Sequence, residues 1–237
     1  MAWPCVFSNA HVAARLGETE MRAFGYNEFM FILFALEWTL KLTAIAFVGG
    51  GIAGVGLALL RISRFAPVRL LATAYIQIIQ GVPLLVLMFL CYYGSAVAGI
   101  EVSALLAASL ALTLNASAFL GAIWESALRS IPKTQWESAE ALALPRRKIL
   151  RYVIAPQAIR LSLPSTVGYL VQIVKETSLA SIIGFVEITR AGQLVSNVTF
   201  EPLKAFGSVA LFYFVVCYSL SLFSRWLENR TVRGVSG

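Results

Sequence analysis

Five long apolar runs constrain the fold of this chain more than any other feature. They occupy residues 29–60, 70–93, 102–128, 163–185 and 206–223. A membrane helix needs about 20 apolar residues to cross a hydrocarbon layer roughly 30 Å thick, and each run approaches or exceeds that length. Only 13% of the 237 residues are charged and 59% are hydrophobic, whereas a soluble domain carries about 25% charged residues. The sequence therefore predicts an all-α, polytopic membrane protein of about five transmembrane helices.

The connections between the runs alternate between basic and nearly neutral. Residues 94–101 contain no Lys or Arg, whereas residues 129–160 contain seven. Because basic connections stay in the cytoplasm, we expect residues 1–28 to form a periplasmic N-terminal segment. Residues 29–228 would form the transmembrane domain, with 129–160 as a cytoplasmic loop, and residues 229–237 a cytoplasmic tail, in a bacterial inner membrane. The net charge of +7 then reflects topology and not a nucleic-acid surface.

Glycine and proline mark two local features of the runs. The second run is interrupted by two glutamines, a glycine and Pro83, which predicts a kink or a re-entrant segment. In the first run, residues 49–54 match the dinucleotide-binding pattern G-x-G-x-x-G, but no strand precedes them, as that site requires. Gly50 and Gly54 instead form G-x-x-x-G, which predicts close helix packing.

The sequence offers no catalytic or metal centre. Its three cysteines, Cys5, Cys91 and Cys217, are far apart, and its single histidine, His11, lies near the N-terminus. These residues lack metal-ligand spacing, and no nucleophile–base arrangement is apparent. No G-x-x-x-x-G-K-[ST] motif occurs, so a P-loop for ATP is absent. We expect no cofactor, no metal and no enzymatic activity, and any ATP hydrolysis would come from a partner subunit.

The long basic connection contains the most regular helical pattern outside the apolar runs. Thr134 followed by Glu137 is a capping box, and an alanine-rich stretch follows. We expect a helix from about Thr134 to Leu144, ended by Pro145, and a second amphipathic helix up to about Ala155. The small side chains favour two interpretations, either a docking surface for another protein or an interfacial anchor.

Several segments of the chain resemble those of one transporter family. Residues 137–143 read E-S-A-E-A-L-A and, with residues 153–158, resemble the EAA loop of binding-protein-dependent importers of the ATP-binding-cassette (ABC) class. Residues 75–86, 175–184 and 189–193 resemble segments of the polar amino-acid (His/Glu/Gln/Arg/opine) branch of that family. The similarity extends in the family's order over most of the chain.

The resemblance implies a permease subunit that moves polar amino acids or related zwitterions by alternating access. It implies several partners: ATP-binding-cassette ATPase subunits, a second permease subunit (the same or a sister chain), an extracytoplasmic substrate-binding protein and a small polar solute. The EAA loop would receive the movement of the ATPase. The implied ATPase-coupling residues are Thr134, Glu137, Ser138, Ala139, Leu142 and Ala143.

The chain departs from the family pattern at several positions. Ala143 stands where the EAA loop has Gly, and a left-handed backbone there would cost about 1 kcal/mol. Gln77 and Gln80 replace Glu and Arg, and Ala122 and Glu125 fall where the family has Glu and Arg. We interpret Glu125 as a solvated charge near the end of its run.

Polar residues in the fourth run suggest a route for solute. Tyr169, Gln172 and Glu176 are spaced i, i+3, i+7, on one helical face. Ionisable residues inside a membrane face a cavity or a partner, so Glu176 would contact the ammonium of a zwitterion or a cationic side chain. The alternative is that Lys175 and Glu176 pair with charges on neighbouring helices. The predicted substrate-pathway residues are Tyr169, Gln172, Glu176, Thr177 and Ser178.

Three other functions remain open from the sequence. A subunit of an ion-gradient-driven secondary transporter is possible, although about five spans are few for that class. An ABC permease for a solute other than an amino acid shares the loop pattern. An intramembrane enzyme would need a reactive constellation that the sequence does not offer.

Overall fold

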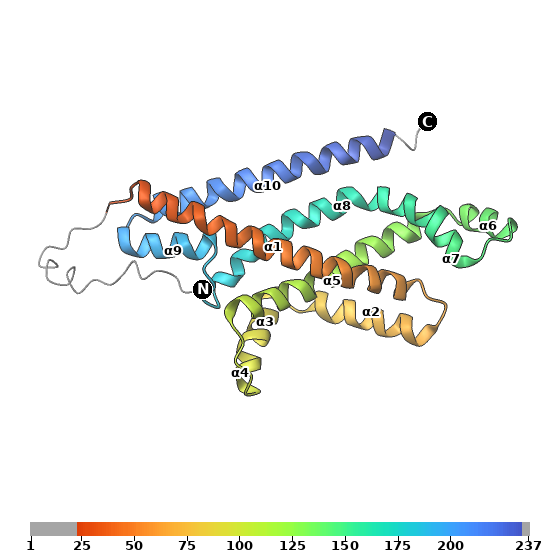
Figure 1. Cartoon of the computed structure of the whole chain (residues 1–237), viewed down its shortest axis with the longest axis horizontal. Coiled ribbons are helices and arrows are strands. Elements are labelled where there is room, and N and C mark those ends of the chain that lie inside the picture. Colours follow the sequence, from red (N-terminus) through yellow and green to blue (C-terminus); the bar gives the residue numbers. More distant parts are fainter. Residues whose placement is uncertain (1–22, 234–237) are drawn as a thin grey trace, which may run out of the picture.

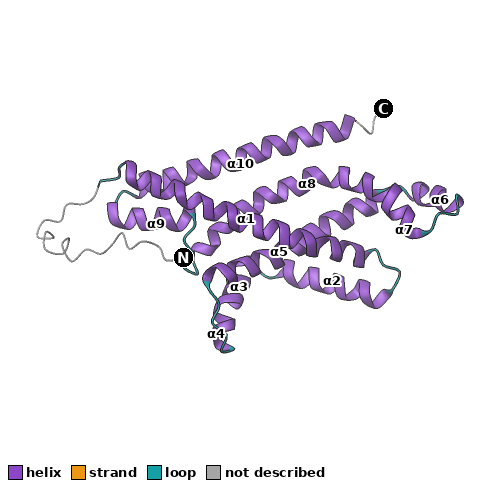
Figure 2. Cartoon of the chain, in the orientation of Figure 1, coloured by secondary structure: helices purple, strands orange, loops and turns teal. Residues whose placement is uncertain are grey.

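The computed structural model describes residues 23–233, and every regular element in that range is a helix (Figures 1 and 2). The predicted all-α fold is confirmed. Cys5, His11 and most of the predicted N-terminal segment lie outside the described residues, as does the end of the tail. The elements are α1 (Tyr26–Arg61), α2 (Ala66–Gly81), α3 (Leu84–Phe89), η2 (Leu90–Gly94), α4 (Ser95–Val97), α5 (Ala104–Ser130), α6 (Lys133–Ala141), α7 (Arg146–Lys148), η3 (Ile149–Ile154), α8 (Ala155–Glu176), η4 (Thr177–Ser181), α9 (Ile188–Thr199) and α10 (Pro202–Arg233).

Three of the described helices, α1, α5 and α10, are long and apolar enough to cross a membrane. The predicted interruption of the second run is confirmed, since α2 and the α3–α4 segment are bent by 99° at Val82–Pro83 and form a fourth span if taken together. α8 is 22 residues long, enough to cross, but it is too polar to belong to this set. Polar groups on such a helix must face other helices or a cavity.

The close contact of α1 with α5 forms the centre of the bundle. A Cβ added at Gly50 would lie 2.4 Å from the Cβ of Ala116, and one at Gly54 would lie 3.1 Å from the amide nitrogen of Gly121. These distances confirm the predicted G-x-x-x-G packing. α5 is the most buried of the three apolar spans, so the other helices are arranged around it.

The remaining helices are arranged on either side of this pair. In Figure 1, α10 lies along one edge of the view, α8 lies next to it, and α2 lies along the opposite edge. α8 contacts both α10 and α5. The ends of the bundle differ: α9 lies beside the start of α1, whereas α6 and α7 project beyond the far end.

A buried carboxylate and the amide next to it join three helices at the α9 end. Glu187, which is 0% exposed, caps α9 by accepting the amide N–H of Arg190 at 2.9 Å. It also accepts the hydroxyl of Tyr213 from α10 at 3.0 Å. The amide of Ile188 donates to Thr39 Oγ1 of α1 at 3.2 Å. These bonds fix the start of α9 against α1 and α10.

The first helix of the connection between α5 and α8 differs from its prediction at both ends. The capping box at Thr134 is wrong: α6 begins at Lys133, directly after the extended Pro132, and has no side-chain cap. Pro132 holds φ at −54° and starts the helix one residue early, so Thr134 has helical backbone and cannot serve as N-cap. α6 also ends at Ala141, before Leu144.

The predicted second helix does not end at about Ala155, before Pro156. α7, η3 and α8 follow one another without a break, and Pro156 lies in the first turn of α8. Proline normally clashes with the carbonyl four residues earlier. Here it follows the π-helical η3, whose wider turn accommodates the ring.

The α1–α5 contact predicts that Gly50→Ala destabilises the protein. The added methyl would overlap Ala116, and overpacking of this kind costs about 1–3 kcal/mol. Thermal unfolding of the detergent-solubilised protein, followed by fluorescence-detected size exclusion, should show a lower midpoint. Gly56→Ala is the control, because a Cβ at Gly56 meets nothing within 4 Å. Equal midpoints for the two variants would contradict the packing argument.

Candidate functional site

A polar cluster lies between α5 and α8, with Asn115 and Tyr169 buried, Glu176 half-buried and Gln172 exposed. Asn115 Nδ2 donates to the Tyr169 hydroxyl and to Glu176 Oε2, both at 3.2 Å. Gln172 Nε2 donates to Glu176 Oε1 at 3.2 Å. Phe119 stacks on the Tyr169 ring, with 5.3 Å between centroids. An acidic group is therefore held by two amides beside an aromatic wall, an arrangement suited to a cationic or ammonium group.

The structure brings together three of the five residues predicted to line the substrate pathway. Tyr169, Gln172 and Glu176 share the cluster, but Thr177 and Ser178 do not. Their hydroxyls donate to the backbone carbonyls three residues earlier, at 2.7 Å in both cases. Such local bonds leave little capacity for solute.

Sequence reasoning missed Asn115, which joins the cluster from α5. It is the one amide side chain in the third apolar run, and a polar residue in a membrane span is a functional candidate. Its position opposite Glu176, 61 residues away, depends on the pairing of α5 with α8. The alternative that Lys175 and Glu176 pair with neighbouring charges is wrong within the described part of the chain, where neither forms an ion pair.

The α6 helix presents one face to the outside and anchors the other. Ala139 is 4% exposed and packs with Ile149 and Ile154 in an apolar cluster beneath the helix. Thr134, Glu137 and Ser138 are exposed, and so is Leu142, at 74%. The outer face of α6 therefore presents acidic, small and apolar side chains, and its inner face is held by the apolar cluster.

Ala143 adopts the left-handed backbone that normally calls for glycine. Its φ is +55°, and its amide bonds to the carbonyl of Glu140 at 2.9 Å, while Leu144 N bonds to the carbonyl of Ala139 at 3.4 Å. This pair of hydrogen bonds is the Schellman motif that closes helix C-termini. Ala143 therefore adopts a turn that glycine adopts without strain, and its side chain adds about 1 kcal/mol of local strain.

Glu125 is not the solvated charge that the sequence suggested. Its side chain is 7% exposed and lies between two guanidinium groups, with Arg61 Nη1 at 2.7 Å and Arg129 Nε at 2.6 Å. The sequence could not show this, because Arg61 lies on α1, 64 residues earlier in the chain.

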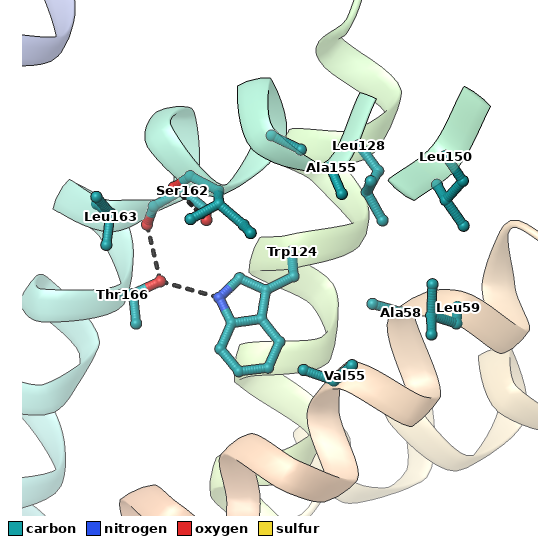
Figure 3. Close-up of a pocket in the computed structure, with 12 residues that line it drawn as sticks. Val55, Ala58, Leu59, Trp124, Leu128, Leu150, Ala155, Ser162, Leu163 and Thr166 are labelled. Carbon is teal, nitrogen blue, oxygen red and sulfur yellow. Dashed lines mark hydrogen bonds between the residues drawn. The ribbon is translucent and has the colours of Figure 1, made fainter. Parts of the chain in front are cut away.

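An apolar cavity of about 310 Å³ lies between α1, α5, η3 and α8. Figure 3 shows Trp124 from α5 pointing into it, with its indole N–H donating to Thr166 Oγ1 at 3.0 Å. Thr166 in turn donates to the carbonyl of Ser162 at 2.8 Å. Because its hydroxyl groups are engaged in this way, the cavity offers no free polar group to a zwitterion, and the Asn115–Glu176 cluster is the better candidate for a polar solute.

The turn at Ala143 predicts that Ala143→Gly stabilises α6. Glycine adopts a positive φ without strain, so opening of α6 should become less favourable by about 1 kcal/mol. Amide hydrogen exchange of α6 in detergent should slow by the factor that corresponds to this free-energy difference of about 1 kcal/mol. Ala141→Gly is the matched control, because Ala141 is helical and glycine there should cost about 1 kcal/mol. Faster exchange in both variants would show that residue 143 is unstrained.

Comparison with known proteins identifies the family. Residues 50–233 match the family described as "Binding-protein-dependent transport system inner membrane component". The chain is 32% identical over 204 residues to the probable amino-acid ABC transporter permease protein YckA of Bacillus subtilis, covering 86% of this chain and 90% of that one. It is 30% identical to a putative glutamine transport system permease protein GlnP of Rickettsia conorii, covering 87% and 95%.

A solved structure shows the same fold. The match to a crystal structure of an amino acid ABC transporter with histidines has a TM-score of 0.82 and 32% identity, and it covers 86% of this chain and 95% of that one. Together with the apolar helices, these findings establish that the chain is a multi-pass membrane protein. It belongs to the binding-protein-dependent transport system inner membrane component family and is the permease subunit of an ABC importer.

Proposed function

We propose that this permease carries polar amino acids or related zwitterions across a bacterial inner membrane. The observation that carries the proposal is the cluster in which Asn115 and Gln172 hold the carboxylate of Glu176 between α5 and α8. A carboxylate at membrane depth is costly unless it serves a partner or a substrate. The names of the relatives, which refer to amino acids, glutamine and histidines, agree with a solute that carries an ammonium group.

In this proposal Glu176 accepts the ammonium or a cationic side chain of the solute. Asn115 and Gln172 hold the two carboxylate oxygens in position, and the Tyr169 ring closes one side of the site. A cation held against both a carboxylate and an aromatic ring gains from charge pairing and from the ring face. Thr177 and Ser178 remain candidates only after their local hydrogen bonds are broken.

The coupling part of the proposal assigns the exposed face of α6 to an ATPase subunit. Glu137, Ser138 and Leu142 would enter a cleft on that subunit, and Ala139 and the turn at Ala143 would hold the helix in place. Two permease subunits would then rock as two ATPases close on ATP, with an extracytoplasmic binding protein delivering the solute. In this arrangement α6 and the end of α10 face the cytoplasm, and the α9 end faces the periplasm.

The assignment of α6 predicts that Glu137→Lys abolishes ATP-driven uptake. The reversed charge would oppose docking of the ATPase, and the exposed side chain leaves folding and membrane insertion unchanged. Uptake of radiolabelled amino acids by cells, with the amount of permease measured by immunoblot, tests this. Glu101→Lys is the control, since Glu101 is also exposed but lies in the loop before α5. Wild-type uptake in the Glu137 variant would exclude the docking role.

The polar cluster predicts that Glu176→Gln lowers uptake of amino acids about tenfold or more, because a charge-assisted hydrogen bond contributes roughly 1.5–3 kcal/mol. The amide keeps the size of the side chain, so the fold should survive. Glu201→Gln makes the same chemical change beside Lys204 at the start of α10 and should leave uptake unaltered. If both variants transport normally, Glu176 has no role in the pathway.

The decisive experiment is reconstitution of the permease with its ATPase and binding protein in liposomes. Uptake of L-histidine, L-glutamine, L-glutamate and L-arginine should require ATP in the compartment that holds the ATPase. Uptake that persists without ATP and collapses with an ionophore would instead identify an ion-gradient-driven transporter. If the transporter shows ATP-dependent uptake of another solute and none of these amino acids competes with it, the substrate is that other kind of solute.

A further inference from the structure

We infer that Arg61 and Glu125 are positioning residues that make α1 move together with α5 when α6 is displaced, an inference that rests on the proposed docking of an ATPase on α6. The two side chains form a bridge between helices at the end of the bundle nearest α6. This role lies outside the EAA loop itself and outside the substrate cluster.

Glu125 forms one ion pair with a residue of another helix and one with a residue of its own helix. Arg61 Nη1 of α1 reaches Glu125 Oε2 at 2.7 Å, whereas Arg129 Nε, four residues along α5, reaches Oε1 at 2.6 Å. Arg61 is 23% exposed and Arg129 is 58% exposed. Because a charge shielded from water interacts more strongly, the bond between α1 and α5 is the better shielded of the two.

The guanidinium of Arg61 is committed to this contact. Its Nε is buried and has no hydrogen-bond partner among the described residues, which is unfavourable unless another interaction holds the group there. The bond to Glu125 is the ion pair that Arg61 forms in the described range. The ion pair therefore determines where the end of α1 lies.

The bridge lies beyond the last of the tight glycine contacts between the two helices. The tight glycine contacts of α1 with α5 reach as far as Leu57 and Gly121, where a Cβ on Gly121 would lie 3.1 Å from the Cβ of Leu57. Beyond them is the apolar cavity lined by Ala58 and Leu59 of α1 and Leu128 of α5 (Figure 3). A cavity leaves the helices room to shift, so the charged bridge is the tie that limits their separation near α6.

Direct contacts also connect α6 and α7 to the loop that follows α1. Arg64 lies 3.9 Å from Glu140 of α6, and Arg146 Nη2 of α7 donates to the carbonyl of Ile62 at 3.5 Å. Arg129 Nη2 also reaches the carbonyl of Arg61 at 3.4 Å. These contacts are long and exposed, so each contributes little alone. They place the end of α1 against the coupling segment, and the short Arg61–Glu125 bridge secures it.

The connections between the helices determine how a displacement of α6 would spread through the bundle. α5 ends at Ser130 and α6 begins at Lys133, so a displacement of α6 reaches α5 through two residues. It reaches α1 through the bridge, and α2 next, because α2 follows α1 after a four-residue loop, residues 62–65. Without the bridge, the end of α1 beyond Leu57 would follow α5 less closely, and so would the loop that leads to α2.

The test compares charge-neutral variants in the transporter assembled with its ATPase and binding protein in liposomes. Arg61→Gln removes the bond between helices and leaves Glu125 paired with Arg129. Arg129→Gln removes the bond within α5 and the long, exposed contact with the carbonyl of Arg61, and it leaves the bridge. Arg69→Gln is the control for loss of a positive charge, since Arg69 is exposed and forms no ion pair in the described range. Arg61→Lys keeps the charge on α1.

The readout is the amount of radiolabelled L-histidine or L-glutamine transported per ATP hydrolysed, which a general loss of stability does not change for the folded fraction. Arg61→Gln should lower this ratio at least about fivefold, a typical size for coupling between sites, while ATP hydrolysis continues. Arg129→Gln should lower the ratio less than Arg61→Gln does, and Arg69→Gln should leave it unchanged. Arg61→Lys should retain most of the wild-type ratio. Arg61→Gln combined with Glu125→Gln leaves no buried charge unpaired and serves if the single variant folds poorly.

Two outcomes overturn the inference. A wild-type ratio in both Arg61→Gln and the double variant would show that the bridge transmits nothing. An equal or larger loss in Arg129→Gln would show that the bond between Arg61 and Glu125 is not the main tie between α1 and α5. If the wild-type transporter shows no ATP-dependent uptake at all, the proposed function fails, and the inference fails with it.

Discussion

The structure depends on the close approach of α1 and α5 in a medium that supplies little hydrophobic driving force between helices. Lipid tails are as apolar as leucine side chains, so helix association relies on van der Waals contact. Gly50 and Gly54 of α1 allow the backbone of α5 to come within the distance that a Cβ would occupy. The rigid pair that results provides the surface against which α2, α8 and α9 pack.

This rigid pair also explains where polar groups can lie. α5 is largely buried and offers Asn115 to one side, where α8 brings Glu176 within 3.2 Å. α8 needs such a neighbour, because its polar residues make it too hydrophilic to face lipid on all sides. The polar cluster and the apolar α1–α5 contact thus share one helix, which connects the centre of the bundle to α6.

The two acidic groups on this route, the buried Glu125 and the half-buried Glu176, illustrate different uses of a carboxylate between helices. Glu176 is held by neutral amides, which leaves its charge available to a cation. Glu125 is saturated by two guanidinium groups, which leaves it nothing to offer a solute and makes it a mechanical tie. The partners, and not the residue type, decide which role a carboxylate can have.

The sequence by itself determined the all-α class, the positions of the long runs, the break at Pro83, the small-residue packing at Gly50 and the similarity to the EAA loop. These are properties of period, length and short motifs, which neighbouring residues dictate. It also indicated that residue 143 could need a glycine backbone, and the left-handed φ there agrees. The start of α6 and the continuity of α7 with α8 were predicted wrongly, because a proline can begin or enter a helix as well as end one.

Only the tertiary structure decided which distant side chains meet. Asn115 joins Glu176, and Arg61 joins Glu125, through pairings between helices that no local pattern encodes. The burial of Glu125 and Glu187 follows from the same pairings, since a charge at the end of an apolar run looks solvated until a neighbouring helix covers it. The sequence therefore determined which helices form, and the packing of those helices determined which polar groups lie together.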